Sequence, residues 1–272
     1  MRSTAAALFC CQAYDKNVRW TFCGCHASER SCQRQVLQVL FDFDKQPYRR
    51  GDIMPDIIYE DKQLLVCRKP AGLAVQNASF GRMDLESMVR NYLMEKSGKP
   101  NPYLGVVHRL DQPVQGLLVF AKTPAAAAAL SAQVQDGRMT KEYLAVVCGK
   151  LPEKEGELVH FLKKEPAGNC SRAVGEKTPG AKRAELSYRV LAEADGRALV
   201  RIKLKTGRHH QIRVQMVACG APLYGDAKYN PGAQRGERLA LCADRLSFVH
   251  PAGGKRVEFT CRPDNFPAPW EG

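Results

Sequence analysis

The sequence predicts an α+β fold with a mixed, largely antiparallel sheet, because two hairpin patterns stand apart from the helical ones. Asp195-Gly196 joins an alternating stretch at 186–190 to a second one at 200–205, as expected for a tight hairpin. Near the end, two short apolar stretches flank Gly253-Gly254 in the same way. Hairpins with separate helices, without regular strand–helix alternation, favour this class over a parallel α/β sheet.

The remaining elements follow from local patterns along the chain. Short apolar runs predict strands at 57–59, 64–67, 116–121 and 143–148. Asp84 can cap a helix whose apolar residues recur every three or four positions. Thr123-Pro124 opens an alanine-rich helix that ends near Gly137. A last helix is expected to follow Arg208 and to stop at Gly220.

The charge balance points to a polyanionic partner. The 272 residues carry 41 Lys and Arg against 28 Asp and Glu, a formal net charge of +13. Nucleic acid is the leading candidate for that partner, and an acidic membrane surface is the second. No apolar run approaches the about 18 residues that a membrane-spanning helix needs, so that class is excluded.

Residues 1–53 differ from the rest of the chain. They hold five of the eleven cysteines and little sustained periodicity, so we expect an irregular extension or a mis-assigned start before Met54. Cys23, Cys25, His26 and Cys32 lack the paired spacing of a zinc site. The cysteines that follow are scattered singly, which favours free thiols and a cytoplasmic location. Residues 54–272 are expected to form the catalytic domain.

Asp111 is the first candidate for chemistry. It lies in the run Val107-His108-Arg109-Leu110-Asp111, ahead of Pro113 and an apolar strand. A carboxylate held beside Arg109 should stay ionised, because an opposite charge favours the charged form, and an ionised carboxylate can act as a nucleophile. Taken alone, an aspartate ahead of a proline is more often a turn-former than a nucleophile.

Two further segments carry candidate residues. In 206–213, Arg208, His209, His210 and Arg213 stand at an expected helix start, where they suit phosphate or a base edge; a solvated basic surface is the alternative. In 141–146, Tyr143 could stack on a base, or it could pack in the core. Arg201, Lys203 and Lys205 form one face of a strand, either a basic stripe or an ordinary solvated face.

Together these segments resemble the RluA family of RNA pseudouridine synthases. The shared runs are His-Arg-Leu-Asp at 108–111, Lys-Glu-Tyr-Leu-Ala-Val-Val at 141–147 and Thr-Gly-Arg-His-His-Gln-Ile-Arg at 206–213. Weaker matches flank them, among them Lys69-Pro70-Ala71-Gly72-Leu73, Leu223-Tyr224-Gly225-Asp226, Tyr229 and Arg238-Leu239-Ala240-Leu241. All these runs occur in the same order as in the family, and together they span residues 56–270. The family commonly has Thr-Ser-Gly after the aspartate, where this chain has Val114-Gln115-Gly116.

The resemblance implies the pseudouridine synthase fold, with flanking helices and a central catalytic cleft, and an isomerase that needs no metal or cofactor. It assigns Asp111 as nucleophile, Arg213 as its ionic partner and Tyr143 as a contact to the target base. Leu241 would be an apolar wall of the pocket. The remaining cationic candidates would hold the RNA, namely Arg109, Arg208, His209, His210, Lys203 and Lys205.

The resemblance leaves the RNA open, because the family modifies both rRNA and tRNA. Two other functions remain: a non-catalytic RNA-binding protein on the same fold, and an N-glycosidase that releases free uracil. A monomer is expected.

Overall fold

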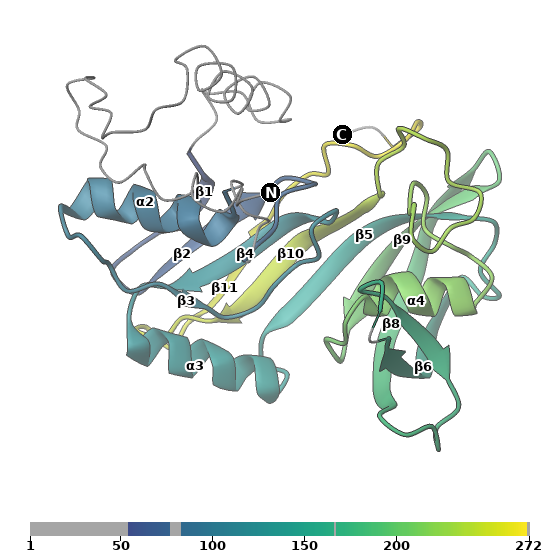
Figure 1. The fold of residues 1–272 in the computed structure, drawn as a ribbon, viewed down its shortest axis with the longest axis horizontal. Helices are drawn as coiled ribbons and strands as arrows, with labels where there is room; N and C mark the ends of the chain where they lie inside the picture. The colour runs from purple at the N-terminus through teal and green to yellow at the C-terminus, as the bar shows by residue number, and fades with distance from the viewer. Residues whose placement is uncertain (1–53, 77–82, 166, 271–272) are drawn as a thin grey trace, which may run out of the picture. The chain divides into compact units, whose positions relative to one another are not determined.

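The structure, a computed structural model, describes residues 54–76, 83–165 and 167–270, which belong to one compact unit, Ile53–Gly272. The expectations about residues 1–53 lie outside the described residues. Within these, no helix is long and apolar enough to cross a membrane. Figure 1 shows a single curved sheet with helices packed against it.

The elements follow one another in a fixed order along the chain. They are β1 (Asp56–Glu60), β2 (Leu64–Lys69), α2 (Leu85–Ser97), β3 (Gly105–Val106), β4 (Gln115–Ala121), α3 (Pro124–Gln135), β5 (Thr140–Cys148), β6 (Glu155–Lys164), β7 (Ser171–Val174), β8 (Lys182–Ala194), β9 (Arg197–Leu204), α4 (Gln211–Ala218), β10 (Leu241–Val249) and β11 (Arg256–Thr260).

The strands form one eleven-stranded sheet of order β1-β2-β4-β10-β5-β9-β8-β6-β7, with β11 on β10 and β3 on β4. Among the described strands, β4 and β10 pair in parallel and the other named pairings are antiparallel. The predicted α+β class with a largely antiparallel sheet is therefore confirmed.

Local signals placed most elements correctly. The Asp84 carboxylate accepts a hydrogen bond from the Ser87 amide at 2.8 Å, and the Thr123 hydroxyl accepts one from the Ala126 amide at 3.2 Å, so both caps form as predicted. Asp195 and Gly196 have positive φ angles of 52° and 71°, which suit the two central positions of the β8–β9 hairpin. The β6–β7 hairpin was not predicted.

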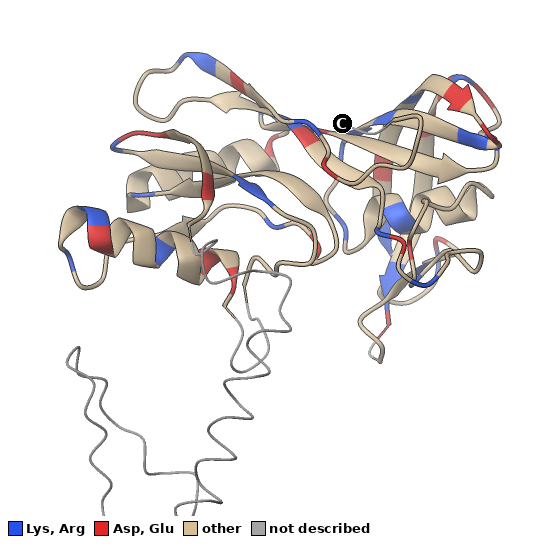
Figure 2. Cartoon of the chain, turned by 90° about the horizontal axis from the view of Figure 1, so that it is seen from above, with Lys and Arg blue, Asp and Glu red and all other residues tan. Residues whose placement is uncertain are grey.

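The sheet has two different faces at β5 and β9. Tyr143 lies opposite Ile202, and both point to one face, whereas Glu142 and Lys203 are paired on the other. That other face is mixed in charge: Lys205 pairs with Glu157 at 2.7 Å, and Arg201 pairs with Asp244 at 3.0 Å. Figure 2 shows acidic and basic residues interspersed over the described elements. The face is therefore a partly neutralised surface and not a uniformly basic stripe.

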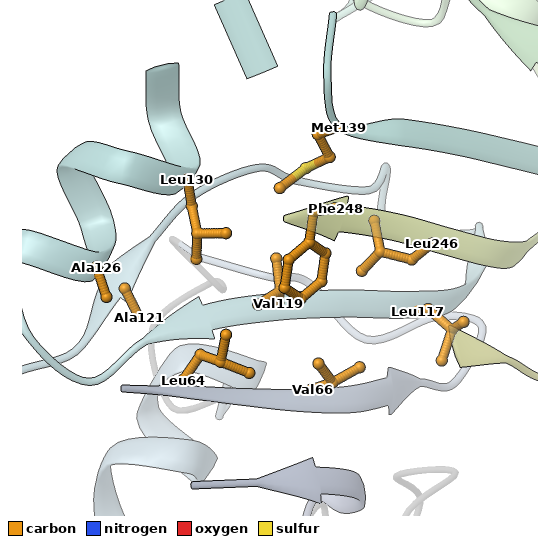
Figure 3. Close-up of a cluster of buried hydrophobic side chains, with 10 residues drawn as sticks. All are labelled: Leu64, Val66, Leu117, Val119, Ala121, Ala126, Leu130, Met139, Leu246 and Phe248. Carbon is orange, nitrogen blue, oxygen red and sulfur yellow. The ribbon is translucent and has the colours of Figure 1, made fainter. Parts of the chain in front are cut away.

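The main core lies between α3 and the sheet (Figure 3). Leu130 of α3 packs with side chains of β2, β4 and β10, such as Leu64, Val119 and Phe248, all of them buried. Burying each large apolar side chain contributes about 1.5–3 kcal/mol. This cluster fixes β4, the strand that begins just after Asp111.

Candidate active site

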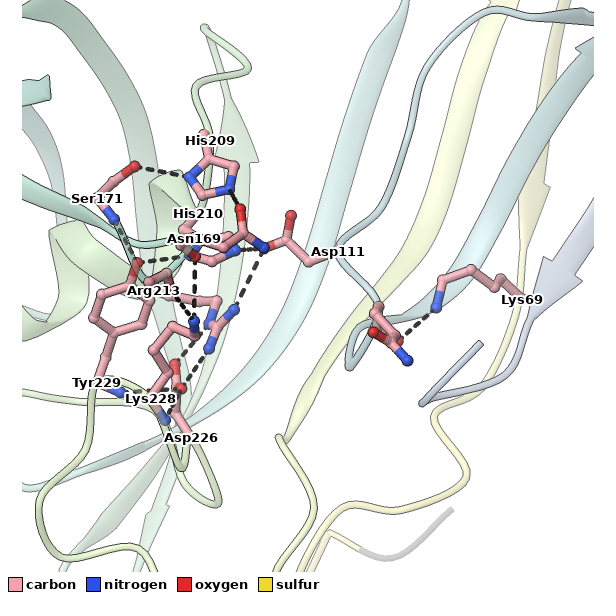
Figure 4. Close-up of polar contacts among 12 residues, drawn as sticks. Lys69, Asp111, Asn169, Ser171, His209, His210, Arg213, Asp226, Lys228 and Tyr229 are labelled. Atoms are coloured by element: carbon pink, nitrogen blue, oxygen red, sulfur yellow. Dashed lines mark hydrogen bonds and ion pairs between the residues drawn. The ribbon is translucent and has the colours of Figure 1, made fainter. Parts of the chain in front are cut away.

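A buried lysine holds the backbone of the loop that contains Asp111. Lys69, at the end of β2, donates from Nζ to the carbonyl oxygens of Leu73 at 2.7 Å and Gln112 at 3.0 Å. The Gly72 amide donates to the same Gln112 oxygen at 2.9 Å, and the Val114 amide closes a turn onto the Asp111 carbonyl. Figure 4 shows Lys69 reaching the loop behind Asp111. The loop backbone is thus held independently of any substrate.

The departure at Val114-Gln115 is accommodated by packing and by new hydrogen bonds. Val114 is buried, and the Gln115 amide bonds to the Asn265 side chain and accepts from the Asp264 amide at 2.9 Å. Gly116 is required, because it has φ +125° and an added Cβ would lie 2.4 Å from the Ala243 carbonyl oxygen of β10. The two family hydroxyls are therefore replaced by a link to the C-terminal segment.

Arg213 faces Asp111 from the first turns of α4. Its Nη1 lies 3.6 Å from the Asp111 carboxylate, and its Nε and Nη2 donate to both oxygens of Asp226 at 2.8 and 2.6 Å. The guanidinium also lies over the Tyr229 ring, 4.8 Å from its centre. Arg213 is buried, so the bidentate pair with the fully buried Asp226 carboxylate compensates its charge and fixes its direction (Figure 4).

His210 also faces Asp111. Its Nε2 lies 3.6 Å from the carboxylate, and its Nδ1 shares a 2.6 Å hydrogen bond with the Tyr229 hydroxyl. Burial first, and then the charge of Arg213, lower the pKa of His210 to about 3, so the ring is neutral at neutral pH. Placing its proton on Nε2 gives Asp111 a donor and leaves Nδ1 to accept from Tyr229.

His209 is tied to the β6–β7 hairpin. Its ring stacks on His210 at 3.8 Å, its Nδ1 is 2.8 Å from the Ser171 hydroxyl, and its Nε2 is 3.1 Å from the Asn169 side chain. His209 and His210, which were expected to hold RNA, therefore make hydrogen bonds and a ring contact within the protein. His210 is only 7% exposed and lies against Asp111, and its role in holding RNA stays a prediction.

Tyr143 and Leu241 line the sheet face on the same side. Tyr143 is buried, and burial, with the negative charge of Asp111 as the second cause, raises the pKa of its phenol. Ala145 lies two residues after Tyr143 on β5, so both side chains point to the same face of the sheet. Leu241 of β10 lies opposite Ala145, and its side chain therefore points to that face as well. Arg213 faces Asp111, and the charge of Asp111 acts on Tyr143, whereas Leu241 is placed only by its position on the same sheet face.

Two opposing effects act on the Asp111 carboxyl. Burial is the larger and raises its pKa, while Arg213, followed by His209 and Lys69, lowers it; the net shift is upward. The argument from the local sequence considered only the neighbouring positive charge of Arg109, and the family resemblance implied Arg213 as the ionic partner. In the structure the facing arginine is Arg213, and desolvation outweighs it.

The other cationic candidates are placed differently from one another. Arg109 is exposed and makes no hydrogen bond or ion pair with a described residue, and Arg208 is exposed with its Nε on the Arg183 carbonyl at 2.9 Å. Lys203 and Lys205 point to the face opposite Tyr143. The two arginines are thus exposed in the loops that lead to Asp111 and to α4, and Lys203 lies on the other face of the sheet from Tyr143.

Three residues of this site carried no role in the sequence argument: Asp226, Tyr229 and Lys69. Each occurs within a run quoted for the family resemblance, which was the available signal. The turn into Asp226 requires glycine, because Gly225 has φ +66° and an added Cβ would lie 2.1 Å from the Arg238 carbonyl oxygen. In the described part of the chain, no three His, Cys, Asp or Glu side chains gather as metal ligands would.

The chain is similar in sequence to known proteins over most of residues 54–272. A sequence model of the family described as RNA pseudouridylate synthase matches residues 63–218. Ribosomal large subunit pseudouridine synthase D of Zymomonas mobilis is 36% identical over 222 residues, covering 76% of this chain and 69% of that protein. The uncharacterized RNA pseudouridine synthase YhcT of Bacillus subtilis is 34% identical over 198 residues, covering 72% of this chain and 64% of that protein.

Solved structures show the same fold. Human RNA pseudouridylate synthase domain containing 1 superposes with a TM-score of 0.65 at 24% identity, covering 81% of this chain and 89% of that one. Human RNA pseudouridylate synthase domain containing 4 gives a TM-score of 0.64 at 23% identity, covering 76% and 87%. The sequence matches establish more than the fold: the chain belongs to the RNA pseudouridylate synthase family, an isomerase family that converts uridine to pseudouridine.

Proposed function

We propose that this chain converts specific uridines of rRNA or tRNA to pseudouridine, with Asp111 as the nucleophile. The observation that carries the proposal is a largely desolvated carboxylate facing a fixed arginine, next to a buried tyrosine. Several relatives are named for the ribosomal large subunit, which favours rRNA between the two RNA classes.

The reaction exchanges one bond of the ribose C1′ for another. The bond from C1′ to N1 of uracil breaks, the base turns, and a bond forms from C1′ to C5. N1 gains a proton and C5 loses one, so atoms and electrons balance without a co-reactant. Asp111 attacks the sugar or assists departure of the base, and burial strengthens it by removing water from the carboxylate.

Arg213 and His210 hold the Asp111 carboxylate in place from the α4 side. Because Arg213 donates two hydrogen bonds to Asp226, its guanidinium is already oriented in the absence of RNA. Tyr143 contacts the target base. Its raised pKa keeps it a neutral phenol, so it acts as a hydrogen-bonding group and not as a free phenolate.

The target uridine must leave its stack to reach Asp111. Arg109 and Arg208, both exposed, are placed to bind the RNA backbone around it. Lys203 and Lys205 lie on the other face of the sheet from Tyr143, away from this proposed RNA path. Their role in RNA binding stays a prediction, as do the monomeric state and the cytoplasmic location.

The test is to incubate the purified protein with total RNA from cells that lack the gene, then digest the RNA and separate its nucleosides. The proposal expects pseudouridine to increase and no free uracil to appear. Free uracil would instead identify an N-glycosidase, and an unchanged nucleoside profile with RNA bound would favour a non-catalytic RNA-binding protein. Mapping carbodiimide-reactive positions in the same RNA identifies the uridine.

A further inference from the structure

We propose that Lys141 binds a phosphate of the RNA next to the target uridine, a role that rests on the function proposed above. Lys141 lies on β5, two residues before Tyr143, so both side chains point to the same face of the sheet. It was quoted in a family run, but neither its sequence context nor the site described so far assigns it a task.

Lys141 lies between the two loops that build the site. On one side, its Nζ is 3.9 Å from the Cβ position that Gly207 lacks, in the loop that leads into Arg208 and α4. On the other side, its charge contributes to lowering the pKa of His108, which begins the run that ends in Asp111. The ammonium group therefore lies close to the loop that leads into α4 and acts on the run that ends in Asp111.

The ammonium group has no partner among the described residues. The side chain is half-buried, yet no hydrogen bond or ion pair to it is present, and burial lowers its pKa. The adjacent Glu142 does not compensate, because it points to the opposite face and faces Arg201 at 3.4 Å and Arg245 at 3.9 Å.

Two other covered lysines of the described chain, Lys69 and Lys122, have acceptors for their ammonium groups. Lys69 is buried with three carbonyl acceptors, and Lys122 pairs with Glu60 at 2.6 Å. Partly burying an ammonium group without a partner costs free energy, and an anion that arrives with the substrate offsets this cost. A compact charge with three donors suits a phosphate oxygen, and a cation there also reduces the repulsion between Asp111 and the RNA backbone.

The test measures RNA binding and not turnover, so it can fail independently of pseudouridine formation. The probe is a fluorescent single-stranded 20-mer of uridine, and its affinity is measured by anisotropy at a series of KCl concentrations. Lys141→Met should weaken binding roughly tenfold at low salt and reduce the slope of log K against log[KCl] by about 0.7, the value for one phosphate contact on a single strand. Lys141→Arg should keep the slope of the wild type.

Lys255→Met is the matched control, because Lys255 is an exposed lysine of the β10–β11 hairpin with no side-chain partner among the described residues. It removes the same charge and should leave the slope unchanged. Lys141→Met should also unfold at the same temperature as the wild type or higher, since it removes an unpaired, partly buried charge. An unaltered slope for Lys141→Met, an equal loss in Lys255→Met, a lowered melting temperature for Lys141→Met, or a wild type that does not bind the probe would each overturn the proposal.

Discussion

At the scale of single residues, reactivity at Asp111 depends on two opposed effects. Burial makes the charged carboxylate less stable, and Arg213 offsets part of that cost. Bulk water would weaken both effects, because it solvates the carboxylate and screens the arginine. The distance of 3.6 Å between Arg213 and the Asp111 carboxylate is longer than the 2.6 Å contact of Arg213 with Asp226, so Arg213 neutralises Asp111 incompletely, as the proposed nucleophilic role requires.

The pH dependence of the reaction follows from the raised pKa of Asp111. Only the deprotonated carboxylate is a nucleophile, so activity is lost as the pH falls through that pKa. Because the shift is upward, the loss should begin at a higher pH than the ordinary aspartate value of about 3.9 allows. The measurement is kcat/KM across the acidic range, with circular dichroism to confirm folding at each pH. A flat profile down to the ordinary value would contradict the upward shift.

Tyr143→Phe removes only the hydroxyl from a buried ring. The apolar contacts remain, so stability and RNA affinity should change little, while a lost hydrogen bond to the base should slow turnover roughly 2- to 12-fold. Single-turnover rates for the two proteins on the mapped RNA measure this effect. Equal rates would make Tyr143 a packing residue only.

At the scale of elements, α4 and the turn after it act together. Arg213 on the helix and Asp226 after it are joined by a buried, bidentate ion pair, and the Asp226 carboxylate also accepts from the amides of Lys228 and Tyr229. The same turn places Tyr229 against both Arg213 and His210. The position of Arg213 therefore depends both on α4 and on the turn that contains Asp226.

Asp226→Ala should therefore destabilise the protein by about 3–5 kcal/mol, because it leaves the Arg213 charge buried without its main partner. Urea unfolding at equilibrium measures the change. The matched control is Asp264→Ala, which breaks the exposed ion pair with Arg68 and should cost no more than about 1 kcal/mol. A similar loss of unfolding free energy in the two variants would show that the buried ion pair stabilises the protein no more than the exposed one.

Elements with strong local signals could be predicted from the sequence. Helices α2 and α3 have side-chain caps at their starts, and the β8–β9 turn has an Asp-Gly pair, so local chemistry decided them. The β6–β7 hairpin lacks such a signal, since β6 is charged at both ends and only partly buried. That hairpin matters for the site, because Ser171 and Asn169 hold His209.

At the scale of the whole molecule, the site is assembled from distant parts of the chain. Asp111, Tyr143, Arg213 and Asp226 come from four segments that the sheet order brings together, and no local pattern encodes their distances. The family resemblance named the first three as site residues, because shared runs far apart in the chain carry long-range information that local patterns lack. It did not distinguish the two faces of β9, so it grouped Lys203 and Lys205 with residues of the other side.

Residues 54–272 should form pseudouridine without the segment before them. Every residue assigned to the site lies between Lys69 and Leu241, within the unit Ile53–Gly272, and the remaining net charge is 33 − 23 = +10. The nucleoside assay on this shortened protein should match that of the full chain. A folded but inactive product would show that residues 1–53 contribute to RNA recognition or to the site.

The central claim is that the Asp111 carboxylate performs the chemistry, and Asp111→Asn tests it most directly. The substitution keeps the size of the side chain and removes its negative charge, so fold and RNA binding should persist. The measurement is the pseudouridine content of RNA from cells that lack the gene, after incubation with equal amounts of wild-type and variant protein. We predict that the wild type forms pseudouridine and that Asp111→Asn forms none above background. Pseudouridine formation by Asp111→Asn at a rate near that of the wild type would contradict the assignment.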